Sequence, residues 1–175
     1  MDRSVIVSGG NGFIGSHLVK QLIKENYNPI LLLRPNSDLV RLKGIRKIKI
    51  LTTINYGDSG LIKELKALKP NCFFHCAWDG VLGSKKNNEI QSKSIGLVVK
   101  SISLTKKINC LKWIGLGSHA EYGNLNEILT EKSKCNPTTL YGKIKLKSCI
   151  KSMRLCKKYG INGNWIRIFN TYGPH

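Results

Sequence analysis

A tyrosine and a lysine lie four residues apart in a segment that the sequence predicts to be helical. Tyr141 and Lys145 belong to the run YGKIK, and residues at this spacing share one face of an α-helix. An unperturbed tyrosine has a pKa of about 10, too high for a base near neutral pH, but an adjacent ammonium group favours the phenolate. The pair is therefore suited to exchanging a proton with a hydroxyl or a ketone. A chance pairing is the alternative, because this helix carries many other lysines.

The stretch VSGGNGFIG near the N-terminus places Gly9, Gly12 and Gly15 between an apolar run and a helical pattern. In a strand–turn–helix unit such glycines permit, in order, the tight turn, the approach of a pyrophosphate to the backbone, and close packing of the helix on the sheet. The phosphate would rest on the helix N-terminus, where free N–H groups and the dipole favour negative charge. We expect a dinucleotide-binding turn, and a structural turn without a ligand is the alternative.

Six short apolar runs alternate with helical patterns along the chain. Most are continuously apolar, which is typical of strands buried on both faces. This alternation predicts an α/β fold, namely a Rossmann-like doubly wound parallel sheet with helices on both faces. The polar, turn-rich residues 121–139 are interpreted as an active-site loop. We expect strands at Ser4–Ser8, Pro29–Leu33, Ile48–Leu51, Cys72–Ala77, Trp113–Leu116 and Asn164–Phe169, and helices at Phe13–Glu25, Ser59–Leu68, Asn87–Lys107 and Tyr141–Tyr159.

The composition is that of one folded domain with an excess of positive charge. With 175 residues, 41% hydrophobic and 22% charged, the chain is long enough to bury a core. No apolar run reaches the roughly 18 residues of a membrane span and no signal-peptide pattern is present, so we expect a cytoplasmic protein without a membrane partner. The net charge is +19, but the lysines are spread along the chain without an aromatic–basic RNA motif. Nucleic acid is therefore not the predicted partner, and a preference for anionic ligands such as nucleotides is expected instead. Six cysteines without a CxxC pair predict no metal site.

Six segments in order resemble one family. GGNGFIG at 9–15 resembles the nucleotide-binding fingerprint of the extended short-chain dehydrogenases/reductases, the family that includes NAD(P)-dependent nucleotide-sugar epimerases and dehydratases. The other segments that resemble this family are Gly57-Asp58, FFHCAW at 73–78, GLGSHAEYG at 115–123, YGKIK at 141–145 and RIFNTYGP at 167–174. Their order and spacing extend the resemblance over the whole chain.

The resemblance implies a role for each segment. Tyr141 would exchange a proton with a sugar hydroxyl or ketone while hydride passes to or from a nicotinamide, and its pKa would be lowered by Lys145 and by the oxidised nicotinamide. Ser118 would bind and position the same substrate oxygen. Lys145 would also hold the nicotinamide ribose, and Asp58 would approach the adenine. The implied cofactor-binding residues are Gly9, Gly12, Phe13, Ile14, Gly15, Arg34, Asp58, Cys76, Ala77, Trp78, Tyr141 and Lys145.

Other residues near these motifs carry more than one interpretation. Trp78 stands where many relatives have a small residue, and it would either stack on the ligand or close the core. Tyr122, four residues after Ser118, is expected to shape the pocket wall. His75 is interpreted as a hydrogen-bonded residue at a strand end. His119 is better placed for chemistry because it adjoins Ser118, and a loop residue without a chemical role is the alternative.

Two departures from the family's patterns narrow the reaction. The sugar 4,6-dehydratases usually carry Asp-Glu directly after the catalytic Ser or Thr, where this chain has His119 and Ala120. Relatives that combine 3,5-epimerisation with reduction tend to have a cysteine in place of Ala120. Since alanine cannot transfer protons, 4-epimerisation or reduction of a 4-keto sugar remains.

The cofactor expectation is NAD(P), with NADP favoured over NAD. An acid about 20 residues beyond the glycines would bind the ribose 2′-OH of NAD. Here no acid follows the second strand until Asp38, whereas Arg34 stands where a guanidinium could pair with the 2′-phosphate of NADP. An exposed arginine without this role is the alternative.

Members of the family continue beyond the motif at 167–174 into a part that grips the nucleotide-sugar. We therefore expect residues 1–175 to form the NAD(P)-binding Rossmann domain with the catalytic Ser, Tyr and Lys, and the substrate-binding part to be largely absent. The predicted substrate is a nucleotide-activated sugar, and a homodimer is kept open. The alternative is a non-catalytic or truncated NAD(P)-binding module that needs a partner or the missing half.

Overall fold

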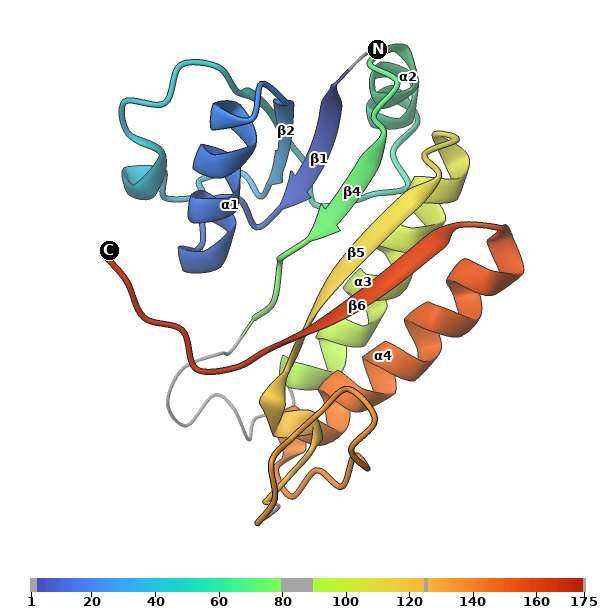
Figure 1. Ribbon diagram of the computed structural model, residues 1–175. Helices are drawn as coiled ribbons and strands as arrows, with labels where there is room; N and C mark the ends of the chain where they lie inside the picture. Colours follow the sequence, from blue (N-terminus) through green and yellow to red (C-terminus); the bar gives the residue numbers. More distant parts are fainter. Residues whose placement is uncertain (1–2, 80–89, 125, 175) are drawn as a thin grey trace.

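The computed structural model describes residues 3–79, 90–124 and 126–174. It contains a six-stranded, all-parallel sheet in the order β3-β2-β1-β4-β5-β6 (Figure 1). The predicted Rossmann-like fold is therefore confirmed. The strands are β1 (Ser4–Ser8), β2 (Asn28–Leu33), β3 (Lys49–Thr52), β4 (Cys72–His75), β5 (Lys112–Ser118) and β6 (Asn162–Ile168). The helices are α1 (Phe13–Lys24), α2 (Ser59–Ala67), α3 (Ile90–Lys107) and α4 (Leu140–Tyr159), and the short 3-10 turns are η1 (Val40–Leu42) and η3 (His119–Glu121).

Most element bounds agree with the predictions to within two residues. The start of the third predicted helix, residues 87–89, lies outside the described residues. The fifth strand is longer than predicted, because Lys112 precedes the predicted start and Gly117 and Ser118 continue it past Leu116. A Cβ at Gly115 would lie 2.3 Å from the Trp113 ring and 2.7 Å from the Trp165 ring. These glycines make room for tryptophans on the same and the neighbouring strand.

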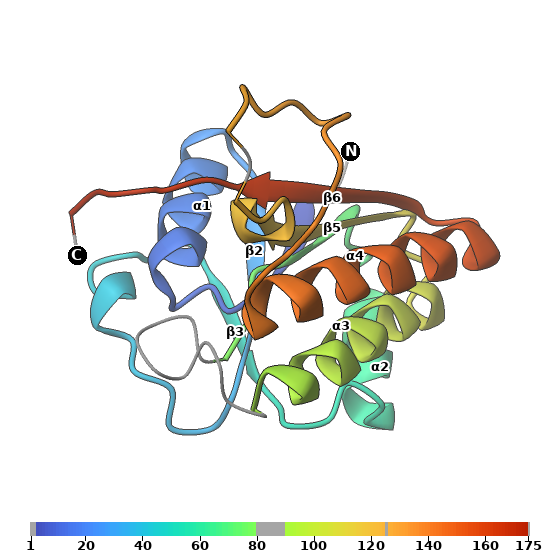
Figure 2. The same cartoon turned by 90° about the horizontal axis from the view of Figure 1, so that it is seen from below.

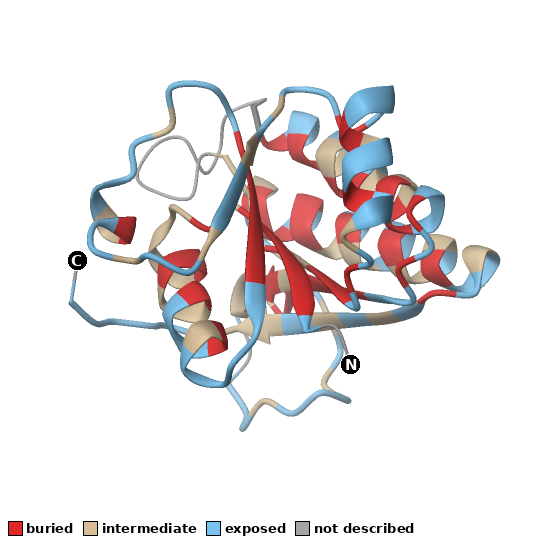
Figure 3. Ribbon diagram, turned by 90° about the horizontal axis from the view of Figure 1, so that it is seen from above, coloured by how far each residue is buried: buried red, intermediate tan, exposed pale blue. Residues whose placement is uncertain are grey.

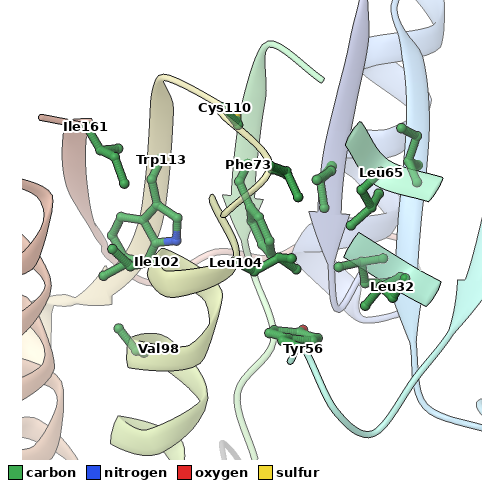
Figure 4. Packing of buried hydrophobic residues seen from close by; sticks show 14 of the residues in the cluster. Leu32, Tyr56, Leu65, Phe73, Val98, Ile102, Leu104, Cys110, Trp113 and Ile161 are labelled. Atoms are coloured by element: carbon green, nitrogen blue, oxygen red, sulfur yellow. The ribbon is translucent and has the colours of Figure 1, made fainter. Parts of the chain in front are cut away.

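The central strands are apolar on both faces, as predicted, because each face is covered by helices (Figure 2). Ile6 and Leu32 pack with α2, α3 and α4, in a core centred on Phe73 and Trp113 (Figure 4). Val7 points to the opposite face and packs with residues of α1. Figure 3 shows the resulting continuous burial of the middle of the sheet.

The strand order reverses between β1 and β4. The chain builds outward from β1 to β3, then returns to place β4 on the other side of β1 and continues to β6. Such a reversal leaves a crevice at the carboxyl ends of the two central strands, where ligands of doubly wound sheets bind. The glycine turn after β1 and residues 76–79 after β4 both lie at this crevice.

Within the described ranges, no helix is long and apolar enough to cross a membrane. The same residues include no cluster of three or more His, Cys, Asp or Glu side chains placed to hold a metal ion.

Candidate active site

The three glycines of the turn have different surroundings. Gly9 has φ +69°, and a Cβ there would lie 2.7 Å from the backbone nitrogen of Ala77. A Cβ at Gly15 would lie 2.1 Å from the Gly9 carbonyl oxygen, so α1 can pack against the turn only without a side chain. At Gly12 the nearest atom is the same carbonyl oxygen at 3.3 Å. The fold itself thus requires Gly9 and Gly15 more strictly than Gly12, whose free face borders a hollow.

We predict that Gly15→Ala destabilises the chain although alanine is the better helix former. The added methyl group overlaps the Gly9 carbonyl, and such overpacking costs about 1–3 kcal/mol. The matched control is Gly96→Ala in α3, where a Cβ meets nothing within 4 Å and the expected change is a stabilisation of about 0.5–1 kcal/mol. Urea denaturation measures both free energies of unfolding, and equal values for the two variants would contradict the packing role of Gly15.

Two hollows meet at the glycine turn. One, of about 490 Å³, reaches the ends of β2 and β3 and is called here the β2-side hollow. The other, of about 840 Å³, extends to the end of β5 and the start of α4 and is called the β5-side hollow. Both are lined by Gly9, Gly12, Cys76 and Trp78. Together they form an elongated site with the glycine turn at its middle.

Ser118, Tyr141 and Lys145 all line the β5-side hollow. Ser118 ends β5, and its side chain is hydrogen-bonded to that of Tyr141. Lys145 follows one helical turn later and donates from Nζ to the Leu116 carbonyl oxygen at 2.7 Å. The helix is positioned closely by Gly142, where a Cβ would lie 2.2 Å from the Ala120 carbonyl oxygen. The three residues that the sequence predicts to be catalytic thus line the same hollow.

Burial dominates the electrostatics of this group. It raises the pKa of Tyr141 above its ordinary value, the hydrogen bond from Ser118 opposes this rise, and the charge of Glu121 adds to it. Burial lowers the pKa of Lys145 to about 7, against the opposing effect of Glu121. The expected lowering of the Tyr141 pKa is therefore not produced by the protein's own residues. The Tyr141 pKa was expected to be lowered by Lys145 and by an oxidised nicotinamide, and of these two only the nicotinamide remains as a source of the lowering.

Trp78 lines both hollows. Its position is compatible with both of its expected roles, which are to stack on the ligand and to close the core. It packs against the core, and its indole Nε1 donates to Gln91 Oε1 at 2.8 Å. Its ring also faces the site, with the Lys145 ammonium 3.5 Å from the ring centroid and the Tyr141 ring edge-on at 6.2 Å. Beside it, burial raises the pKa of Cys76 to about 12, so this thiol stays protonated and is no nucleophile.

Three charged residues were predicted to bind the cofactor, and Arg34 is the one of them that lines the β2-side hollow. Its exposed guanidinium donates to Asp79 Oδ1 at 3.3 Å. Asp58 lines neither hollow. Its carboxylate instead accepts from the Leu61 backbone N–H at 2.7 Å and forms the N-cap of α2. This cap explains an aspartate at that position without a ligand.

The neighbouring side chains divide between wall and support. His119 and Ala120 line the β5-side hollow, whereas Tyr122 does not and lies buried behind it. His75 is buried, with Nδ1 3.0 Å from the Ser8 hydroxyl, and burial lowers its pKa to about 3. It is thus a neutral hydrogen-bonded residue at a strand end, as predicted.

Sequence reasoning missed the buried carboxylate of Glu121. Its side chain is fully buried and accepts three hydrogen bonds, from Ser118 N–H at 2.8 Å, Trp165 Nε1 at 2.9 Å and Arg167 Nε at 2.9 Å. The only signal in the sequence was that GLGSHAEYG contains an acidic residue, Glu121, and RIFNTYGP a basic one, Arg167. Nothing in the spacing indicated that the two would pair.

The comparisons with known proteins agree with this geometry. A model of the NAD dependent epimerase/dehydratase family matches residues 5–175. UDP-glucose 4-epimerase 2 of Arabidopsis thaliana is 26% identical over 195 residues, covering 100% of this chain and 54% of that protein.

Solved structures show the same fold. The UDP-glucose 4-epimerase of Brucella ovis in complex with NAD superposes with a TM-score of 0.84 at 22% identity, over 96% of this chain and 52% of that one. The UDP-glucose 4-epimerase of Thermotoga maritima with UDP-glucose gives 0.81 at 24% identity, over 98% and 57%. The chain thus spans about half the length of each of these relatives. Because the family model covers nearly the whole chain, the protein belongs to the NAD dependent epimerase/dehydratase family.

Proposed function

We propose that this chain is the cofactor-binding and catalytic half of an enzyme that moves hydride at the 4-position of a nucleotide-activated sugar, as a 4-epimerase or a 4-keto reductase. The observation that carries the proposal is the meeting of Ser118, Tyr141 and Lys145 in a hollow that continues past the glycine turn. The similar proteins named above, which are called UDP-glucose 4-epimerases, support the same reaction class.

The residues around the turn fit a nicotinamide dinucleotide. The first turn of α1 leaves its backbone N–H groups without intrahelical partners, and Gly12, Phe13, Ile14 and Gly15 line the β5-side hollow beside them. These N–H groups would bind the pyrophosphate, and the free face of Gly12 lets it approach. Lys145 would hold the nicotinamide ribose. The bound cofactor would supply the hydride chemistry.

The protein's own residues would handle the substrate oxygen. Ser118 would hold this oxygen in hydrogen-bond distance of Tyr141, and Tyr141 would take or return its proton. The raised pKa of Tyr141 keeps the phenol protonated, as proton donation to a keto oxygen requires. Trp78, beside Lys145, would exclude water from that side of the hollow.

The wall of the hollow supports chemistry confined to one carbon. A dehydratase needs a further acid and base beside the catalytic serine, but His119 and Ala120 provide no carboxylate there. Glu121 is near, yet it is fully buried and engaged by three donors, so it cannot reach a sugar carbon. The arrangement therefore favours 4-position redox chemistry.

We further propose that Arg34 binds the 2′-phosphate of NADP and that Asp79 competes with this phosphate for the guanidinium. Arg34→Ala should weaken NADPH binding about tenfold or more and NADH binding little, because a charge-assisted hydrogen bond is lost only with NADPH. Asp79→Asn should strengthen NADPH binding selectively. Arg46→Ala, which removes an arginine outside both hollows, is the control. Calorimetric titration measures both cofactors, and equal losses in Arg34→Ala would refute this assignment.

The proposed activity is tested by mixing the chain with NAD or NADP and UDP-glucose and following the absorbance of reduced nicotinamide and the appearance of the 4-epimer. The expected result is either reduced cofactor, at no more than one equivalent per enzyme molecule, or formation of the 4-epimer. Binding of cofactor without either product, across nucleotide-sugars of both 4-configurations, would instead support the non-catalytic module.

A further inference from the structure

The carboxylate of Glu121 has no part in the proposed chemistry, yet it occupies the centre of a hydrogen-bonded network directly behind Ser118. Space for the network is made by Gly117, where a Cβ would lie 2.4 Å from Glu121 Oε1 and 2.3 Å from Trp165 Nε1. A buried carboxylate persists only where donors and an opposite charge compensate its desolvation. Here Ser118 and Trp165 each supply a hydrogen-bond donor, and Arg167 supplies a donor and the opposite charge.

The network fixes the end of β5. Glu121 accepts a hydrogen bond from the Ser118 backbone N–H, and the Ser118 hydroxyl accepts one from the Ala120 N–H at 3.2 Å. These two hydrogen bonds form a capping box at the start of η3. The same hydroxyl is the hydrogen-bond partner of Tyr141. The orientation of the serine that faces Tyr141 is thus set from behind by Glu121.

The network also reaches Lys145. The Lys145 ammonium lies 5.8 Å from the centroid of the Trp165 ring, whose N–H donates to Glu121. The titratable groups around the ammonium are Cys76 and His75 near the end of β4, Glu121 from η3, and Tyr141 from α4. Cys76 and His75 are neutral because burial raises the first pKa to about 12 and lowers the second to about 3.

We infer that Glu121 is a positioning residue that acts in two ways: with Arg167 it orients Ser118 against Tyr141, and its buried negative charge favours the ammonium form of Lys145 around neutral pH. This role deepens the proposed function and rests on it, because an ammonium at Lys145 is what would hold the nicotinamide ribose. Burial alone drives the Lys145 side chain toward the neutral amine, and a negative charge behind it opposes that loss.

Lys145 loses its proton as the pH rises through its pKa, which is about 7. Removing the charge in Glu121→Gln lowers this pKa, so the ammonium is lost at a more acidic pH, by about one pH unit. Cofactor affinity at neutral pH should fall with it, because less of the chain then carries a charged Lys145.

The test follows the titration of Lys145 by nuclear magnetic resonance of lysine Cε groups in the full chain without cofactor, with the Lys145 signal identified by its loss in Lys145→Met. Glu121→Gln should move the midpoint to lower pH. The control Glu64→Gln removes the same charge from α2, where Glu64 forms a half-exposed ion pair with Lys49 of β3, and should leave the midpoint unchanged. An unchanged midpoint in Glu121→Gln would overturn the inference.

The folding of the variants is checked separately from the titration. Glu121→Gln leaves Arg167 without its carboxylate partner, so a loss of folding is checked by circular dichroism. If that variant unfolds, Glu121→Gln/Arg167→Lys removes only the negative charge and leaves a cation whose flexible stem can reach solvent. The same downward shift is then expected, and no shift would overturn the inference. Because the titration needs neither cofactor nor turnover, a failure of the proposed enzymatic function would leave this result interpretable.

Discussion

Gly12→Val should abolish tight binding of the nicotinamide dinucleotide while the chain stays folded. The backbone at Gly12 has φ −77° and ψ 175°, which any residue adopts, and a Cβ there meets only the Gly9 carbonyl oxygen at 3.3 Å. The valine branches would instead fill the space over the first turn of α1 that the pyrophosphate requires. We expect the dissociation constant for NADH to rise about 100-fold, equivalent to about 2.7 kcal/mol.

Calorimetric titration and a thermal melt of the same sample separate the two effects. Gly12→Ala serves as the graded control, since a single methyl group should give a smaller loss of affinity. Retention of the original NADH affinity in Gly12→Val would show that the glycine turn is structural and binds no phosphate.

Tyr141→Phe should remove the chemistry without removing the cofactor. The substitution deletes one hydroxyl, the one that is hydrogen-bonded to Ser118, and leaves the ring that contacts Trp78. Loss of a positioned acid–base group costs about 100-fold to 10,000-fold in rate. We therefore expect reduction of the cofactor by a nucleotide-sugar to slow by at least about 100-fold, with NADH affinity nearly unchanged.

The matched control for this variant is Tyr172→Phe, which deletes the hydroxyl of a tyrosine that is 99% exposed and lines neither hollow. Stopped-flow absorbance of the cofactor gives the rates for both variants. A Tyr141→Phe rate equal to that of Tyr172→Phe would exclude Tyr141 as the acid–base group.

The fold could be predicted from the sequence because its signals are local. Continuous apolar runs mark β1, β2 and β4, since each is covered on both faces, and the glycines mark the turn that Gly9 and Gly15 make sterically necessary. The segments holding Ser118, Tyr141 and Lys145 could be identified by their spacing and by resemblance. That they share one hollow required the structure.

The remaining features depend on contacts between distant segments. Glu121 and Arg167 are 46 residues apart and pair only because β5 and β6 are neighbours. Asp58 was predicted to approach the adenine, and this stays a prediction. The structure adds that its carboxylate caps α2, a role that the same residue type fills locally. Tyr122 was expected in the pocket wall, but its hydroxyl lies 3.3 Å from Arg167 Nη1, behind that wall. The spacing of these residues along the sequence could not reveal which side chains near η3 face the hollow and which lie behind it.

The most direct test of the central claim is calorimetric titration of the purified 175-residue chain with NADH and with NADPH. The claim is that the crevice between β1 and β4 binds a nicotinamide dinucleotide with its reactive ring beside Tyr141 and Lys145. It predicts one-to-one binding of at least one cofactor, which Gly12→Val weakens and Tyr141→Phe does not. A chain that circular dichroism shows to be folded, but that binds neither cofactor, would contradict it.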